Sequence, residues 1–172
     1  MDVLAGARRG GAPDWWIGGG VLRDLVWDSR AGTFDPARVR DVDLAFFDPT
    51  DLSTGRDEQV ERLLAAERPG VRWDAKNQAA VHTWYRRRFG FDVPPLHSAA
   101  DGVATWPETA TAVAVRLEDD GELRVTSVAG GVHDLLHGIC RRNPRRVSHE
   151  EYRRRLLRKD VPGRWPYVVV HP

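Results

Sequence analysis

Apolar residues recur along the chain with two different periods, which together predict helices mixed with short strands. Spacings of three or four residues indicate helices, and these are expected over 21–27, 57–68 and 131–139. Alternation at every second position indicates strands, and these are expected over 111–117 and 122–127. The Asp-Asp-Gly sequence between the two strands predicts a hairpin. No linker divides the pattern, so we predict a single α+β domain over residues 1–172.

Shorter signals place the remaining elements. Strand-forming runs predict short strands over 15–17, 42–47, 71–76 and 167–170. Ser98 and Ser148 each precede an acidic residue three positions later, a pattern that begins a helix. The segment 77–89 is compatible with a helix, and residues 1–13 form either a frayed end or a short lead-in helix. Leu25 and Leu63 are expected on the buried faces of the helices that contain them.

Composition and charge restrict the class of protein but not its chemistry. The chain has 172 residues, of which 41% are hydrophobic and 30% charged, as in an ordinary globular domain. It has no apolar run near the roughly 20 residues of a membrane helix and no secretory signal pattern, so we expect a cytoplasmic protein without membrane contact. A single cysteine, Cys140, excludes an internal disulfide. The balance of 26 basic and 25 acidic residues does not favour RNA binding.

A glycine-rich turn is the first of three features with chemical potential. Gly19 and Gly20 lie where a short strand meets a helix, and Arg23 and Asp24 follow in the first turn of that helix. Glycine lets the backbone approach a ligand closely, and the N–H groups of a helix start attract phosphate. This segment is therefore a candidate phosphate-binding turn.

Carboxylates on the next two predicted strands are the second and third features. Asp41 and Asp43 are two residues apart, so they share one face of the strand at a spacing of about 7 Å. Such a pair can hold two divalent cations. Asp74, on the following strand, could share one cation and accept a proton. Oxygen ligands without histidine or thiolate favour Mg²⁺ or Mn²⁺.

The order of these features resembles a known superfamily. The segment 19–25, with Gly-Gly-x-x-Arg-Asp, and the pair Asp41 and Asp43 resemble signatures of the polymerase-beta-like nucleotidyltransferases, especially the heads of CCA-adding and poly(A)-adding enzymes. Over about residues 14–165 the chain resembles a small bacterial nucleotidyltransferase-like family. The segments that carry this second resemblance are 16–20, 41–43, 47–48, 76–79, 82–85, 106–113 and 143–144.

The resemblance implies a minimal nucleotidyltransferase fold, a short mixed β-sheet flanked by helices, and a reaction class. A nucleoside triphosphate would lie against Gly19 and Gly20, with Mg²⁺ or Mn²⁺ held by Asp41, Asp43 and Asp74. The resemblance leaves Asp74 as either the base or only a metal ligand. The chain is too short for the helical RNA-binding domains of the longer relatives, and it lacks their base-recognition motif.

Several residues near these motifs keep two interpretations at this stage. Arg23 either contacts a phosphate or pairs with Asp24 or Asp41. Lys76 shares a strand face with Asp74, which allows a phosphate contact. Asn77 either binds the nucleotide or fixes the backbone after the strand. His82 either approaches the acceptor or belongs to a buried hydrogen-bond network.

Two further patterns are assigned ordinary roles. His133 and His137 have the spacing of a zinc-protease helix, but Asp134 stands where that motif has Glu and no third ligand is spaced to match, so we expect helix-face histidines. The arginines over 86–88 and 141–158 could lie on a helix face that binds RNA phosphate, but solvated, ion-paired helices are the expected arrangement.

The sequence thus predicts a metal-dependent nucleotidyltransferase that moves a nucleoside monophosphate to a hydroxyl of a small molecule or a protein. The alternatives are a nucleotide-binding regulatory protein without turnover and a transferase that modifies tRNA ends.

Overall fold

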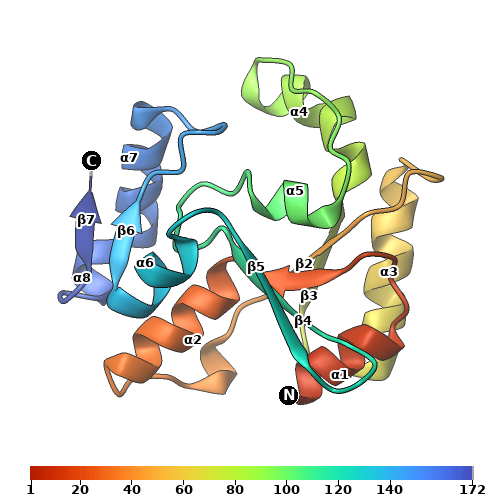
Figure 1. The fold of residues 1–172 in the computed structure, drawn as a ribbon, viewed down its shortest axis with the longest axis horizontal. Helices are drawn as coiled ribbons and strands as arrows, with labels where there is room; N and C mark the ends of the chain where they lie inside the picture. Colours follow the sequence, from red (N-terminus) through yellow and green to blue (C-terminus); the bar gives the residue numbers. More distant parts are fainter. Residues whose placement is uncertain (172) are drawn as a thin grey trace. The chain divides into compact units, whose positions relative to one another are not determined.

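The computed structural model describes residues 1–171 of the chain, and Figure 1 shows its helices and strands. The chain divides into two compact units. Unit 1 consists of Met1–Ile17, Arg40–Gly102 and Val115–Val125. Unit 2 consists of Gly18–Val39, Val103–Ala114 and residues 126–171. Strands β1, β4 and β5 each run from one unit into the other, and helix α5 (Ala99–Val103) ends one residue into unit 2. The remaining elements are described within their own unit.

Most elements of unit 1 follow from their local sequence. The lead-in segment is helical, and the two strands with the carboxylates alternate with helices. The elements are α1 (Asp2–Arg9), β2 (Val42–Phe46), α3 (Thr54–Glu67), β3 (Trp73–Asn77), the 3-10 turn η2 (Gln78–Ala80), α4 (Val81–Phe89) and α5 (Ala99–Val103). The capping pattern at Ser98 is confirmed, because its hydroxyl accepts a hydrogen bond from the Asp101 N–H at 3.0 Å.

Unit 2 contains the glycine-rich turn and the C-terminal elements. Its elements are α2 (Gly20–Arg30), the 3-10 turn η1 (Pro36–Arg38), α6 (Gly131–His137), β6 (Ile139–Arg141), α7 (His149–Lys159), α8 (Val161–Arg164) and β7 (Val169–His171). Ser148 caps α7 as predicted, since its hydroxyl accepts from the Glu151 N–H at 3.1 Å. The predicted tail strand pairs in parallel with β6.

The main sheet is mixed and has the strand order β3-β2-β1-β4-β5, so the α+β fold class is confirmed. Strand β1 covers Trp16–Gly18, and β4 (Val113–Leu117) and β5 (Leu123–Ser127) lie where the hairpin is predicted. The Gly121 N–H donates to the Glu118 carbonyl at 3.1 Å and Gly121 has φ +86°, which closes the turn. Strand β3 lies at the edge of the sheet.

Each unit has its own buried side chains. In unit 1, Leu44 and Phe46 of β2 and Val60 and Leu64 of α3 are at most 1% exposed. In unit 2, the rings of Trp27 and Trp165 meet edge to face with centroids 5.1 Å apart, and both residues are fully buried. Aromatic residues of this size contribute the largest apolar areas to a core.

The single cysteine lies in the unit 2 core. Cys140 is 2% exposed, and the Tyr152 hydroxyl lies 2.8 Å from the Cys140 carbonyl oxygen. Burial raises the pKa of the Cys140 thiol to about 11, so the thiol stays protonated at neutral pH. Burial also raises the pKa of Tyr152. These two groups are therefore neutral core residues.

Two predicted inward residues are exposed, which corrects the helix faces expected from the sequence. Leu25 of α2 is 41% exposed and Leu63 of α3 is 47% exposed. In α2 the buried positions are instead Arg23, Trp27 and Asp28. The buried face of α2 therefore includes the charged side chains of Arg23 and Asp28. Both form ion pairs inside unit 2. Within residues 1–171, no helix combines the length and apolar character that a membrane span requires.

Candidate active site

Two of the three predicted carboxylates lie on strands β2 and β3 of unit 1, and the third directly precedes β2. Asp41 directly precedes β2 and is exposed, and Asp43 is half-buried on that strand. In the parallel pairing of the two strands, Asp43 stands directly opposite Asp74. Paired residues of neighbouring strands project from the same face, and the strands lie about 4.8 Å apart. The register therefore brings the Asp43 and Asp74 side chains to one face of the sheet.

An ammonium group lies beside these carboxylates. The Lys76 Nζ is 2.7 Å from Asp74 Oδ1 and 3.3 Å from Glu61 Oε1 of α3. Burial opposes the charge on Lys76, but the hydrogen bond and charge of Asp74, with Glu61 and Asp57, raise its pKa overall. Lys76 therefore remains a cation, and in this structure it pairs with Asp74.

The donor set fits a hard divalent cation in its chemistry. Within residues 1–171, no three His, Cys, Asp or Glu side chains are grouped closely enough to hold a metal ion. The carboxylates of Asp43 and Asp74 nevertheless supply the oxygen donors that Mg²⁺ and Mn²⁺ prefer. The ion pair of Asp74 with Lys76 shows that this face stabilises a positive charge. The metal-ligand roles of Asp41, Asp43 and Asp74 stay predictions.

Asn77, at the end of β3, fixes the backbone around it. Its side chain is held in a buried position, 2% exposed, where Oδ1 accepts from the N–H groups of Asp48 at 3.0 Å and Ala79 at 3.1 Å. Its Nδ2 donates to the carbonyls of Asp48 at 2.8 Å and Asp51 at 2.9 Å. All four hydrogen-bonding positions of the amide are thus used, so a contact with a nucleotide would require one of these bonds to break.

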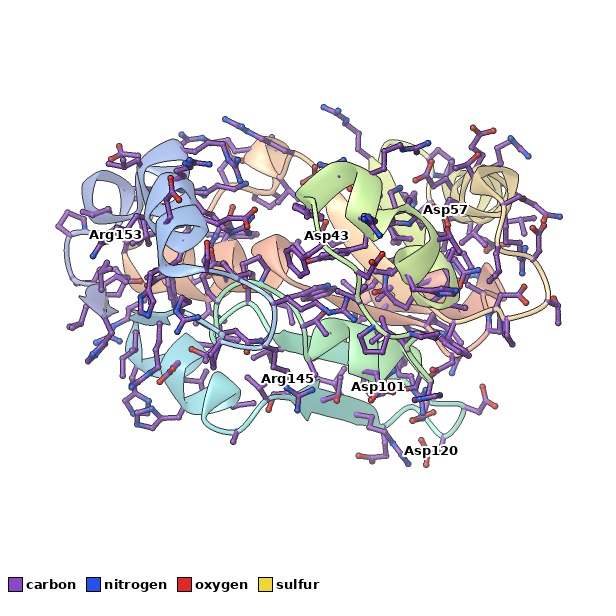
Figure 2. The ribbon with its side chains drawn as sticks, turned by 90° about the horizontal axis from the view of Figure 1, so that it is seen from above. Asp43, Asp57, Asp101, Asp120, Arg145 and Arg153 are labelled. Atoms are coloured by element: carbon purple, nitrogen blue, oxygen red, sulfur yellow. The ribbon has the colours of Figure 1, made fainter. Side chains whose placement is uncertain are left out.

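Two acidic residues of α3 join this network without having been predicted. Asp57 accepts from the Asn77 N–H at 2.8 Å, and Glu61 accepts from the Ala75 N–H at 3.0 Å. Burial raises the pKa of Asp57, although the hydrogen bond from Asn77 opposes this shift. The spacing of the two acids, four residues apart on one helix face, was the available signal. Asp43 and Asp57 are marked on their elements in Figure 2.

The glycine-rich turn begins α2 in unit 2. Gly19 has φ +73°, a conformation that favours glycine, and it caps the helix without a side chain. At Gly18, an added Cβ would lie 2.3 Å from the Val113 carbonyl oxygen, so only glycine allows this close approach. Gly20 starts the helix, where the first N–H groups have no intrahelical acceptor. The Gly19 N–H donates to the Val113 carbonyl at 3.3 Å. A phosphate-binding role for Gly19 and Gly20 stays a prediction.

Arg23 is buried inside unit 2, at 3% exposure. Its Nε and Nη2 lie 2.9 Å and 2.7 Å from Asp24 Oδ1, and its guanidinium lies 5.0 Å from the ring centre of Trp165. The sequence left open whether Arg23 contacts a phosphate or pairs with an aspartate. In the structure Arg23 pairs with Asp24. Arg164 reaches the same helix, because its Nη2 donates to Asp28 Oδ2 at 2.6 Å.

His82 lies in the first turn of α4 in unit 1 and is half-buried. Its Nδ1 is buried and has no hydrogen-bond partner within the described residues. The buried network considered for this histidine therefore does not include Nδ1. A role for His82 beside an acceptor stays a prediction.

Several arginines of the C-terminal part pair with buried carboxylates. Arg155 of α7 binds Glu108, and Arg141 of β6 lies 3.2 Å from Asp134. Both carboxylates are 3% exposed. These arginines therefore neutralise internal charges of unit 2. The expected ion pairing is found, but Arg141 lies on strand β6 and not on a helix.

Comparison with protein families identifies the class of the chain. Residues 6–170 match the model of a family described as nucleotidyltransferase, and the chain belongs to this family. This confirms the resemblance to nucleotidyltransferases seen in the sequence. A comparison with curated protein sequences gives no match.

Comparison with solved structures identifies the fold more closely. The NMR structure of a CCA-adding enzyme head domain is similar to this chain, with a TM-score of 0.80 and 25% sequence identity. The match covers 99% of this chain and 88% of the head-domain chain. The fold is therefore that of a polymerase-beta-like nucleotidyltransferase head. A Thermotoga maritima CCA-adding enzyme complexed with tRNA is 15% identical with a TM-score of 0.59, covering 99% of this chain. A CCA-adding enzyme with CTP is 14% identical with a TM-score of 0.60. This chain spans 38% of each of these two enzymes.

Replacing Asn77 tests its structural role. Asn77→Ala leaves two N–H groups and two carbonyls without their partner, so we expect a loss of about 3 kcal/mol in the free energy of unfolding. Urea denaturation followed by circular dichroism measures this loss. The matched control Gln59→Ala, on the exposed side of α3, should change stability by less than about 0.5 kcal/mol. Equal stability of the two variants would contradict the assignment.

Replacing Arg23 tests whether its pairing holds unit 2 together. Arg23→Lys keeps the charge but loses the two hydrogen bonds to Asp24 and the contact of the guanidinium with the Trp165 ring. The free energy of unfolding should therefore fall by about 2 kcal/mol. Arg62→Lys is the control, because that side chain is 70% exposed. An Arg23→Lys protein as stable as Arg62→Lys would show that the buried pair adds no stability.

Proposed function

We propose that this protein is an active, metal-dependent nucleotidyltransferase that transfers a nucleoside monophosphate from a nucleoside triphosphate to a hydroxyl group. The bond between the α-phosphate and pyrophosphate breaks, a bond from the α-phosphate to the acceptor oxygen forms, and the hydroxyl proton passes to a base. The observation that carries the proposal is the β2–β3 register, which sets Asp43 opposite Asp74 in a chain of the nucleotidyltransferase family.

The carboxylates of unit 1 have the roles of cation binding and proton acceptance in this proposal. Asp41 and Asp43 would hold Mg²⁺ or Mn²⁺, with Asp74 as a further ligand or as the base. When bound, such an ion neutralises charge on the phosphates and favours ionisation of the acceptor hydroxyl. Lys76 is held at Asp74 by its ion pair. The Lys76 ammonium, on the same strand face as Asp74, would supply a positive charge for a phosphate oxygen of the nucleotide.

The glycine-rich turn of unit 2 has the role of phosphate recognition. Gly20 begins α2, an 11-residue helix whose first N–H groups have no intrahelical acceptor. The Gly19 N–H donates to the Val113 carbonyl at 3.3 Å, so Gly19 contributes its open backbone conformation rather than its N–H. The partial positive charge of a helix start stabilises an anion there. Arg23, which is buried against Asp24, acts in this proposal by holding the first turn of α2 and not by contacting the nucleotide.

A small molecule or a protein side chain is the proposed acceptor. The chain carries a net charge of only +1, and arginines of its C-terminal part neutralise buried carboxylates such as Glu108 and Asp134. Binding of a long RNA depends on many cations that remain available to phosphates. These internal pairs therefore favour an acceptor with few negative charges.

Removing the carboxylates of Asp41 and Asp43 tests the catalytic assignment. The double variant Asp41→Ala/Asp43→Ala should lose pyrophosphate release by at least about a hundredfold, because cation binding contributes several kcal/mol to such reactions. Each labelled nucleoside triphosphate is incubated with Mg²⁺ or Mn²⁺ and a pool of small-molecule and protein acceptors. Asp119→Ala/Asp120→Ala in the exposed hairpin turn is the matched control. Undiminished turnover in the first variant would overturn the assignment, and binding of nucleotide by the unaltered protein without turnover would indicate a regulatory protein.

A transferase acting on an RNA end is a second candidate, favoured by the surface of α4. The arginines at 86–88 are exposed, and Phe89 and Phe91 are 37% and 43% exposed. Tyr85 supports both rings, with centroids 4.5 Å and 5.3 Å away. Cationic side chains next to aromatic rings are typical of surfaces on which single-stranded nucleic acid stacks.

The α4 surface allows the two acceptor classes to be separated. With a labelled triphosphate and total RNA, the RNA candidate predicts product that migrates with RNA, and Phe91→Ala should lower this transfer by about tenfold, since stacking contributes about 1–3 kcal/mol per base. Leu157→Ala on α7, at 82% exposure, is the control. Label on small molecules or protein, unchanged by Phe91→Ala, would exclude the RNA candidate.

A further inference from the structure

Two histidines form a stacked pair on helix α6 of unit 2. His133 and His137 are four residues apart, their ring centroids lie 4.2 Å apart, and the ring planes differ by 19°. Both residues are exposed, and the His133 side chain retains 62% of its accessible surface. The two rings are therefore side by side and accessible to solvent.

The inner nitrogen of each ring faces a group that can only accept a hydrogen bond. The His137 Nδ1 lies 2.9 Å from the His133 carbonyl oxygen, and the His133 Nδ1 lies 3.5 Å from Asp134 Oδ1. A carbonyl or an ionised carboxylate has no proton to donate, so both Nδ1 atoms carry the hydrogen when the rings are neutral. The lone pair of each ring is then on Nε2.

Asp134 is fixed as an acceptor by the rest of unit 2. Its Oδ2 accepts from the Thr109 hydroxyl at 2.6 Å and from Arg141 Nε at 3.2 Å. Burial favours the neutral acid, but the hydrogen bonds from Thr109, Arg141 and His133 lower the pKa of Asp134 overall. A carboxylate or carbonyl behind the inner nitrogen is the arrangement that orients histidine ligands in metal sites.

We propose that His133 and His137 bind a divalent late first-row transition metal ion, of the class Cu²⁺, Ni²⁺ or Zn²⁺, through their two Nε2 atoms. Water completes the coordination, because no further His, Cys, Asp or Glu among residues 1–171 joins the pair to make a group of three. The site is separate from the carboxylates of unit 1 in its chemistry, since imidazole selects these ions and carboxylate oxygen selects Mg²⁺ or Mn²⁺.

The helix that carries the pair is held in place before any metal binds. Gly130 and Gly138 flank α6 with φ of +76° and +70°, which sets sharp turns at both ends. Leu135 is 5% exposed, and its carbonyl accepts from the Trp27 Nε1 at 2.7 Å. The backbone positions of the two histidines are thus fixed before binding, and the exposed rings must turn out of their stacked arrangement for both Nε2 atoms to reach one ion.

The arrangement also separates this site from a zinc hydrolase. The acidic neighbour, Asp134, is 3% exposed and already bound to Thr109 and Arg141. It cannot reach a metal-bound water as the Glu of the zinc-protease motif does. The proposed role is therefore ion binding alone, and it does not depend on nucleotidyl transfer.

Titration of the untagged, full-length protein with Ni²⁺ in a calorimeter tests the site. We expect one ion per chain, no displacement by excess Mg²⁺, and a loss of affinity of about tenfold or more in His133→Ala and in His137→Ala, equivalent to about 1.4 kcal/mol. Electron paramagnetic resonance of the Cu²⁺-loaded protein should show two coupled nitrogens, and fewer in either variant. Both histidines are exposed, so the variants should keep the melting temperature of the unaltered protein.

His97→Ala and His149→Ala, which remove other exposed histidines, are the matched controls and should leave Ni²⁺ affinity unchanged. The proposal is overturned if the double variant His133→Ala/His137→Ala binds Ni²⁺ as tightly as the unaltered protein. It is also overturned if the controls lose as much affinity, or if binding requires two protein chains per ion in sedimentation measurements.

Discussion

The side-chain amide of Asn77 is the constraint on which the carboxylate face depends. It joins the end of β3 to the backbone of Asp48 and Asp51, which follow β2, and the Asn77 N–H binds Asp57 of α3. Buried polar networks of this kind fix one arrangement, because any alternative leaves groups unsatisfied. A slip of one residue between β2 and β3 would turn Asp74 to the opposite face of the sheet. The amide thus stabilises the register that sets Asp43 opposite Asp74.

Unit 2 is organised by arginines that bind buried carboxylates. In each pair the carboxylate lies in the interior and the arginine comes from the C-terminal part of the chain: Asp28 with Arg164, Glu108 with Arg155, and Asp134 with Arg141. A guanidinium suits these positions better than an ammonium, because its planar group donates several hydrogen bonds in fixed directions. Part of the basic charge in the sequence is therefore a structural requirement of unit 2.

Local signals in the sequence predicted much of the fold. They did not predict which side chains are buried or which distant residues pair. The hairpin at Gly121 and the caps at Ser98 and Ser148 depend on neighbouring residues only, and they form as predicted. The burial of Arg23 in place of Leu25 depends on Trp165, which is distant in sequence. At the candidate site, alternation along the strand placed Lys76 on the face of Asp74, but the second acid, Glu61, comes from a separate helix.

The environment of Cys140 makes the protein unreactive toward thiol reagents. It is the chain's one cysteine, it is 2% exposed, and its thiol stays protonated because its pKa is about 11. Alkylating reagents and disulfides react with exposed thiolates, so this sulfur offers them neither access nor charge. A cysteine introduced on the surface would consequently be the single labelling position for a fluorophore or spin label, with the native residue left in place.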